Sequence, residues 1–162
     1  GGQLVKDKVA VLGDNTAVKM MGPDGFTGYP DLNKMPEAQG MYLSFAGLST
    51  DLLLANDPKG AGATFVKSYK KTYGKDPVGS YPLYGVAAVQ VILAAIAKSD
   101  GSRKGVTQAV FSGSGVTIPK ATSVLGKELK ISTLSGDTLA KDITIEVIKG
   151  SEETTVKAWT VK

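Results

Sequence analysis

The sequence predicts a mixed α/β fold with parallel sheet elements and a C-terminal hairpin. Apolar residues recur at helical spacing over residues 3–12, and Gly13 stands where such a helix would end. Residues 17–21 and 40–46 are short apolar runs with strand character, and the second has its larger apolar residues at alternate positions. A helix followed by two strands with a loop between them is typical of an α/β unit built on a parallel sheet.

Three helices are expected in the middle of the chain. The first follows a break rich in glycine and proline at 57–62 and ends before Gly74. The second runs over 82–98 and is apolar all round, which predicts that most of its sides are covered. The third runs to residue 111 after Ser102, whose hydroxyl is suited to cap a helix.

Strands are expected in the last third of the chain, because the apolar period changes to two from residue 116. Residues 124–131 have strand-like alternation. In 143–147 the apolar side chains of Ile, Ile and Val alternate with Thr and Glu. A turn at 149–152 then leads to a return strand over 155–161, which predicts a terminal hairpin.

The composition excludes several kinds of chemistry. The 162 residues include no cysteine and no histidine, so a disulfide, a Cys/His zinc site and a Ser-His-Asp or Cys-His triad are all excluded. We therefore expect no enzymatic activity, no metal and no cofactor. The net charge of +4 comes from lysines scattered among acids, with Arg103 as the only arginine. Nucleic-acid binders usually cluster basic residues and use arginine, so no nucleic-acid partner is expected.

The loop at 22–31 is the first candidate for a binding site. In open α/β sheets, ligands bind on loops beyond the carboxyl ends of the strands. This loop presents Asp24, Phe26 and Tyr29 on a backbone with several glycines and prolines, an arrangement that suits a cation beside an apolar group. Pro-Asp-Gly is equally a common turn sequence for backbone reasons alone, so both interpretations stay open.

The second candidate is the start of the helix at 82–98, where Tyr81 and Tyr84 lie. Free N–H groups at a helix start suit an anion. The two tyrosines can equally cover the edge of the core and keep their hydroxyls in water. A third hypothesis, an enzyme that uses Asp24 with Tyr29 or a lysine as acid and base, has no support from residue spacing.

Taken in order, four segments resemble the C-terminal half of type I periplasmic binding proteins, the branched-chain amino-acid receptors of ABC transporters. The resemblance covers nearly the whole chain, and it implies a partial fold with sheet elements from two lobes that close on a ligand. The segments are VKMMGPDGF at 18–26, PEAQGMY at 36–42, FVKSYKKTYGKDP at 65–77 and the helix at 81–95.

The resemblance also implies a domain organisation. Residues 1–48 would belong to the second, C-terminal lobe, and 49–62 would form a hinge or linker. Residues 63–120 would supply helices of the first lobe. Residues 121–162 would supply strands and the terminal hairpin near the hinge or the second lobe. Family members are considerably longer than this chain, so we expect a fragment that by itself binds ligand weakly or not at all.

The family's ligand-binding residues map onto both candidate sites. By position in the Gly-Pro-acid-Gly loop, Asp24 would bind the ligand ammonium, and Tyr81 would line the apolar side-chain pocket. Phe26 and Tyr84 would be neighbours of these two. An ammonium taken out of water needs a charged partner, and an aliphatic side chain needs apolar cover, so the implied roles are physically sound.

The implied function is the solute-binding component of an ABC importer. Its ligand would be a branched-chain or similar small amino acid held between two lobes, and its partner a membrane permease. The full-length precursor would carry a signal and act in the periplasm or outside the cell, with a lipoprotein anchor as one option. Exposed helix faces of the fragment could be covered by a second copy. The alternative is an extracellular ligand-sensing domain of a receptor with the same fold.

Overall fold

A computed structural model describes residues 1–139 and 141–161 and divides into two compact units. Unit 1 consists of Gly1–Ser49 together with the chain from Asp142 onward, and unit 2 consists of Thr50–Lys141. The polypeptide therefore leaves unit 1 after Ser49 and re-enters it at Asp142. The predicted mixed α/β fold with a parallel strand pair is confirmed.

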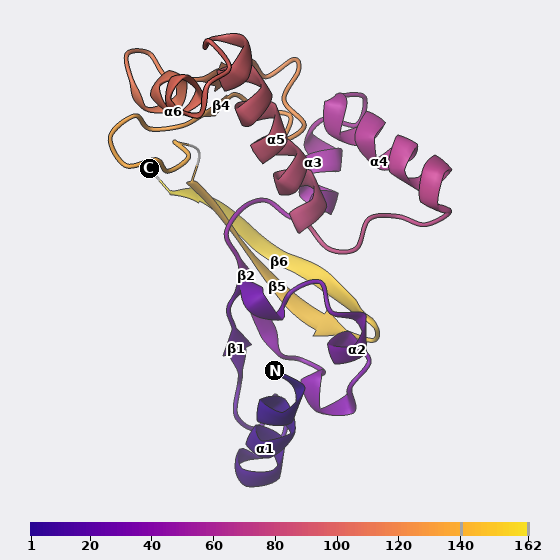
Figure 1. Ribbon diagram of the computed structural model, residues 1–162. Helices are drawn as coiled ribbons and strands as arrows, with labels where there is room; N and C mark the ends of the chain where they lie inside the picture. The colour runs from indigo at the N-terminus through magenta and orange to yellow at the C-terminus, as the bar shows by residue number, and fades with distance from the viewer. Residues whose placement is uncertain (140, 162) are drawn as a thin grey trace. The chain divides into compact units, whose positions relative to one another are not determined.

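Unit 1 is built on a four-stranded mixed sheet in the order β1-β2-β5-β6. The strands β1 and β2 are parallel, whereas β2 and β5 are antiparallel. The predicted terminal hairpin is confirmed as the two long neighbouring strands in Figure 1. The strand expected over 17–21 forms only at its end. The strands are β1 (Met21–Gly22), β2 (Tyr42–Phe45), β5 (Lys141–Lys149) and β6 (Glu152–Val161).

Short helices surround this sheet and close its core. The first, α1 (Gly2–Leu12), ends at Gly13 as predicted. It is followed by the 3-10 turn η1 (Asp24–Phe26), by α2 (Pro30–Asn33) and by the 3-10 turn η2 (Pro36–Ala38). Each of these elements except η1 contributes a buried apolar side chain to one cluster, whose members are Val5, Leu32, Ala38, Met41, Leu43 and Ile148.

An ammonium group organises the loop that follows α1. Lys8 Nζ donates to the carbonyl oxygens of Gly13 at 3.0 Å and Asp14 at 2.9 Å, to Asn15 Oδ1 at 3.0 Å, and to the carbonyl oxygen of Val18. A cation is favoured at a helix C-terminus, where carbonyl groups lack partners within the helix. One side chain thereby holds the chain from the end of α1 to the approach of β1.

The buried face of β5 carries polar side chains. In the antiparallel register, Phe45 lies opposite Thr144 and Leu43 lies opposite Glu146. Opposite residues share a face of the sheet, so Thr and Glu lie on the buried face of β2. Thr144 is fully buried, whereas Ile143 is exposed. Thr144 Oγ1 donates to the carbonyl oxygen of Gly47 at 2.7 Å, which satisfies the buried hydroxyl.

Unit 2 is mainly helical. The predicted helices are confirmed, including the left-handed Gly74 at the end of α4 and the Ser102 cap, whose Oγ accepts from the backbone N–H of Gly105 at 3.0 Å. The Ser102 hydroxyl and its backbone N–H also hold the pKa of Asp100 below its ordinary value. The elements are α3 (Thr50–Asn56), α4 (Ala61–Tyr73), α5 (Tyr81–Ala97), α6 (Arg103–Phe111), β3 (Thr117–Ile118) and β4 (Leu129–Lys130).

The strand predicted over 124–131 is wrong for its first half. Only Leu129–Lys130 forms a strand, which pairs with β3. Gly126 donates its N–H to the carbonyl oxygen of Ser123 at 3.0 Å, and Val124 donates its N–H to Gln90 Oε1 at 3.0 Å. A turn that is hydrogen-bonded to α5 therefore replaces the predicted strand at this point. The apolar side chains of the turn, Val124 and Leu125, are nevertheless buried.

The long helix α5 has two apolar faces, and only one of them is covered. Leu83, Ala87, Val91 and Ala95 form a buried stripe. The opposite side exposes large apolar side chains. The sequence predicted that most sides of this helix are covered, and the described residues do not cover this side. Of the helices described, none has the length and apolar character needed to cross a membrane. The most exposed side chains on this face of α5 are Val89 at 53%, Ile92 at 52% and Leu93 at 59%.

Two glycines provide a matched test of packing in unit 2. A Cβ atom on Gly62 of α4 would lie 2.4 Å from the carbonyl oxygen of Val124, closer than backbone atoms allow. A Cβ atom on Gly85 of α5 would meet no heavy atom within 4 Å. We expect Gly62→Ala to lower the free energy of unfolding by about 2 kcal/mol. Gly85→Ala should raise it by roughly 0.5–1 kcal/mol through helix propensity. Urea denaturation measures both, and equal stability of the two variants would contradict the packing described.

The Lys8 network leads to a second prediction. Lys8→Met keeps the aliphatic part of the side chain but removes the ammonium. The carbonyl oxygens of Gly13, Asp14 and Val18 then lose the hydrogen bond that they accept from Lys8. We expect the free energy of unfolding to fall by about 2 kcal/mol in urea denaturation, the usual range for hydrogen bonds with a charged partner. Lys6→Met is the control, because Lys6 is an exposed lysine on the same helix. If both variants lose the same stability, the network contributes nothing specific.

Candidate functional site

The loop at 22–31, which carries Asp24 and is called the acidic loop below, lies directly after β1, as the sequence predicts. Its Pro-Asp-Gly segment forms the single turn η1, in which Phe26 donates its N–H to the carbonyl oxygen of Pro23 at 3.0 Å. The carbonyl oxygen of Asp24 accepts from the N–H of Thr27 at 2.9 Å and from its hydroxyl at 2.8 Å. These bonds set the backbone of Asp24, whose side chain is half-buried.

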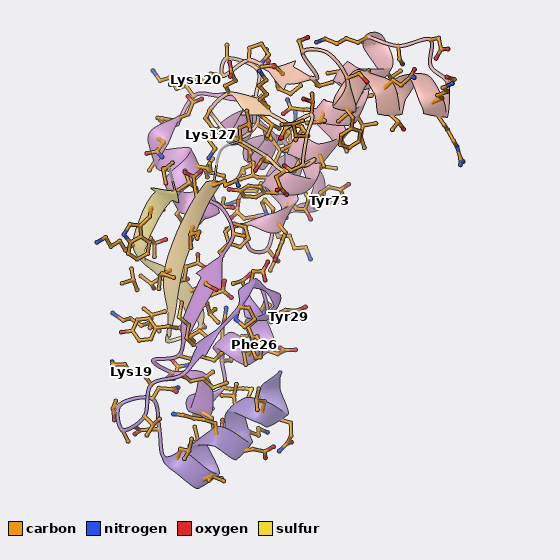
Figure 2. The ribbon with its side chains drawn as sticks, turned by 90° about the vertical axis from the view of Figure 1, so that its left-hand side faces the viewer. Lys19, Phe26, Tyr29, Tyr73, Lys120 and Lys127 are labelled. Atoms are coloured by element: carbon orange, nitrogen blue, oxygen red, sulfur yellow. The ribbon has the colours of Figure 1, made fainter. Side chains whose placement is uncertain are left out.

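The two aromatic residues of this loop have different surroundings. Phe26 is half-buried and packs against the core cluster of unit 1. A Cβ atom on Gly22 would lie 3.1 Å from Phe26 Cγ, so the ring lies close over the backbone of β1. Tyr29 is exposed, and Figure 2 shows both side chains on the same short loop. Phe26 therefore anchors the loop to the core.

The far end of the loop is held by a residue that the sequence did not indicate. Glu153 Oε1, on β6, accepts from the backbone N–H of Gly28 at 2.8 Å and from Asn33 Nδ2 at 3.0 Å. Helix α2, which contains Asn33, lies beside β6 near the hairpin end (Figure 1). Glu153 stands far from the loop in the sequence, and no local pattern connects the two.

The two tyrosines lie at the start of α5, one helical turn apart. The segment before them is tied to the start of α3, because Ser80 Oγ accepts from the N–H of Thr50 at 2.9 Å. Tyr81 is exposed and Tyr84 is half-buried. The structure thus groups Tyr81 with Tyr84 in unit 2, and Asp24 with Phe26 in unit 1. Within the described residues, no group of three or more acidic side chains could hold a metal ion.

Solved structures of proteins linked to solute binding or transport resemble this chain, among them the following three. A leucine-binding protein from Thermotoga maritima matches 86% of it with a TM-score of 0.62 at 18% identity. A solute-binding protein of an ABC transporter from R. palustris, in complex with benzoate, matches 98% of it with a TM-score of 0.61 at 19% identity. A branched-chain amino acid ABC transporter from Thermus thermophilus with bound valine matches 99% of it with a TM-score of 0.62 at 18% identity.

The chain has part of the type I periplasmic-binding-protein fold. At this level of identity the likeness concerns the fold alone, and it confirms the resemblance inferred from the sequence motifs. The matches cover 37%, 40% and 43% of the three solved chains, so the present chain spans about two fifths of their length. The three similar proteins are described as binding or transport proteins. Neither a protein-family model nor a curated protein matches the sequence.

The packing of Phe26 generates a prediction about stability. Phe26→Ala removes a ring that lies against the core, so the free energy of unfolding should fall by about 2–3 kcal/mol. Tyr29→Ala truncates a neighbouring ring that is 57% exposed and should change stability by no more than about 0.5 kcal/mol. Thermal and urea denaturation followed by circular dichroism test the difference. A Phe26→Ala variant as stable as the parent would show that the ring is not part of the core.

Proposed function

We propose that this chain is part of a solute-binding protein of an ABC importer that takes a branched-chain or similar small amino acid. The observation that carries the proposal is the conjunction of the periplasmic-binding-protein fold with a structured acidic loop at the carboxyl end of a parallel strand. Ligands of open α/β sheets bind at such strand ends. The same fold occurs in proteins described as binding leucine or valine.

Asp24 is proposed to bind the ammonium group of the ligand. Its side chain is half-buried, and its backbone is set by the hydrogen bonds of η1. A carboxylate in such a partly dehydrated position interacts more strongly with a cation than one fully in water. A ligand without an ammonium group would gain nothing from this residue.

Tyr81 and Tyr84 are proposed to cover the apolar side chain of the ligand, with Phe26 supporting the acidic loop from the core side. Tyrosine suits this role because its ring is apolar and its hydroxyl tolerates water. The α5 turn that carries both tyrosines is tied to the start of α3 through Ser80, which limits its mobility. Preorganised contacts of this kind reduce the entropy lost on binding.

A role in import implies that the partner is a membrane permease and that the protein acts outside the cytoplasm. Both are inferred from the proteins that share the fold, which include a solute-binding protein of an ABC transporter. Because the chain spans about two fifths of the length of those proteins, binding should be measured in the protein as its gene encodes it.

Isothermal titration calorimetry with paired ligands tests the role of Asp24. Leucine and valine are compared with 4-methylpentanoate and benzoate, which have a carboxylate but no ammonium. Asp24→Asn should weaken leucine and valine binding by about 2–5 kcal/mol, because a desolvated ammonium loses its charged partner. Binding of the two ligands without an ammonium should be unchanged or improved.

Asp31→Asn serves as the matched control, since Asp31 is an exposed carboxylate on α2, a few residues beyond η1. It should leave all four affinities unchanged. If both variants lose the same affinity for leucine and valine, the effect of Asp24 comes from the overall charge of the protein and not from a direct contact with the ammonium. If Asp24→Asn binds leucine as tightly as the parent, the loop does not hold the ammonium, and the proposed site is wrong.

A further inference from the structure

One carboxylate oxygen closes the acidic loop onto the sheet. Glu153 Oε1 accepts from the backbone N–H of Gly28 at 2.8 Å and from Asn33 Nδ2 at 3.0 Å. One donor precedes α2 and the other is its last residue, so a single acceptor holds both ends of this short helix. Glu153 itself is half-buried on β6, two residues after the hairpin turn.

Other contacts also hold this segment, and Leu32 of α2 lies in the core cluster. On one side, the turn bonds of η1 hold the backbone between Pro23 and Thr27. On the other side, Gln39 Nε2 donates to the carbonyl oxygens of Asn33 at 2.9 Å and Met35 at 3.0 Å. The two bonds to Glu153 link the stretch between these points to strand β6 of the sheet. They add a polar link to the apolar packing of Phe26 and Leu32, which also holds this part of the chain to the core.

The donors are suited to a carboxylate. Gly28 has a φ of +77°, a conformation that favours glycine, and its N–H donates to Glu153 Oε1. The Asn33 side chain is only 7% exposed, so its amide needs an internal acceptor. Hydrogen bonds to an ionised acceptor are shorter and stronger than neutral ones, which suits one oxygen that serves two donors.

We propose that Glu153 is a positioning residue, which holds the Gly28 end of the acidic loop so that Asp24 stays in place for the ligand. Glu153 acts through the backbone of Gly28 and is not proposed to contact the ligand. Its effect on the ligand rests on the function proposed above, whereas its effect on the loop does not. The tether can therefore be tested with and without ligand.

Amide hydrogen exchange of Gly28, followed by ¹⁵N NMR without ligand, tests the tether directly. Glu153→Ala should speed exchange at Gly28 by at least about tenfold, since protection requires the acceptor. Glu153→Asp keeps the charge but shortens the reach, so it should act in the same direction with less risk to folding. Glu153→Gln keeps an acceptor oxygen at the same length and should retain most of the protection. Glu152→Ala, which removes an exposed carboxylate next in sequence, should leave Gly28 unchanged.

Calorimetry with leucine or valine on the same variants tests the effect on the site. Affinity should fall about tenfold in Glu153→Asp, recover in Glu153→Gln and stay at the parent value in Glu152→Ala. Unchanged exchange at Gly28 in a folded Glu153→Asp protein overturns the tether. Faster exchange with unchanged affinity overturns the positioning role. If the parent protein binds neither amino acid, the proposed function fails, and the exchange measurement still decides whether Glu153 holds the loop.

Discussion

Pairing of β2 with β5 is the constraint on which the rest of unit 1 depends. These strands meet although almost the whole of unit 2 separates them in the sequence. Their antiparallel register places Leu43 opposite Glu146 and completes the core cluster with Ile148. Because β6 follows β5 through a tight turn, the same pairing determines where Glu153 stands. The acidic loop is then held between its own strand, β1, and a residue from the other end of the chain.

Polar groups, as well as apolar ones, specify this pairing. Thr144 is buried on the face where β2 presents Phe45, and it donates to the carbonyl oxygen of Gly47 and accepts from the N–H of Ser49 at 3.3 Å. Thr160 Oγ1 donates to Asp142 Oδ1 at 2.7 Å on the neighbouring strands. A buried polar side chain is costly unless it finds its partner, so shifting the register would leave these groups unsatisfied. The hydrogen bonds of Thr144 therefore favour a single conformation of the backbone at Gly47 and Ser49, where the chain leaves β2.

Unit 2 depends on a different balance, which centres on α5. One face of this helix is buried by neighbouring elements, and Gln90 ties it to the turn at Ser123 to Gly126 through Val124. Its other face is apolar and exposed, with no charged residue between Tyr81 and Ala97. Contiguous apolar surface of this kind is typical of faces that pack against another protein layer. The start of the helix is tied to α3 through Ser80.

The sequence by itself determined the elements with strong local signals. Apolar periodicity located α1, α4, α5 and the terminal hairpin, and Gly74 and Ser102 marked helix ends because these residues satisfy backbone groups locally. The acidic loop was found for the same reason, as a turn sequence after a short apolar run. Only the tertiary structure decided which face of β5 is buried, why a turn replaces the start of the expected strand, and which residue holds Gly28. Each of these depends on a hydrogen bond or a strand register between distant parts of the chain, and local periodicity carries no information about such partners.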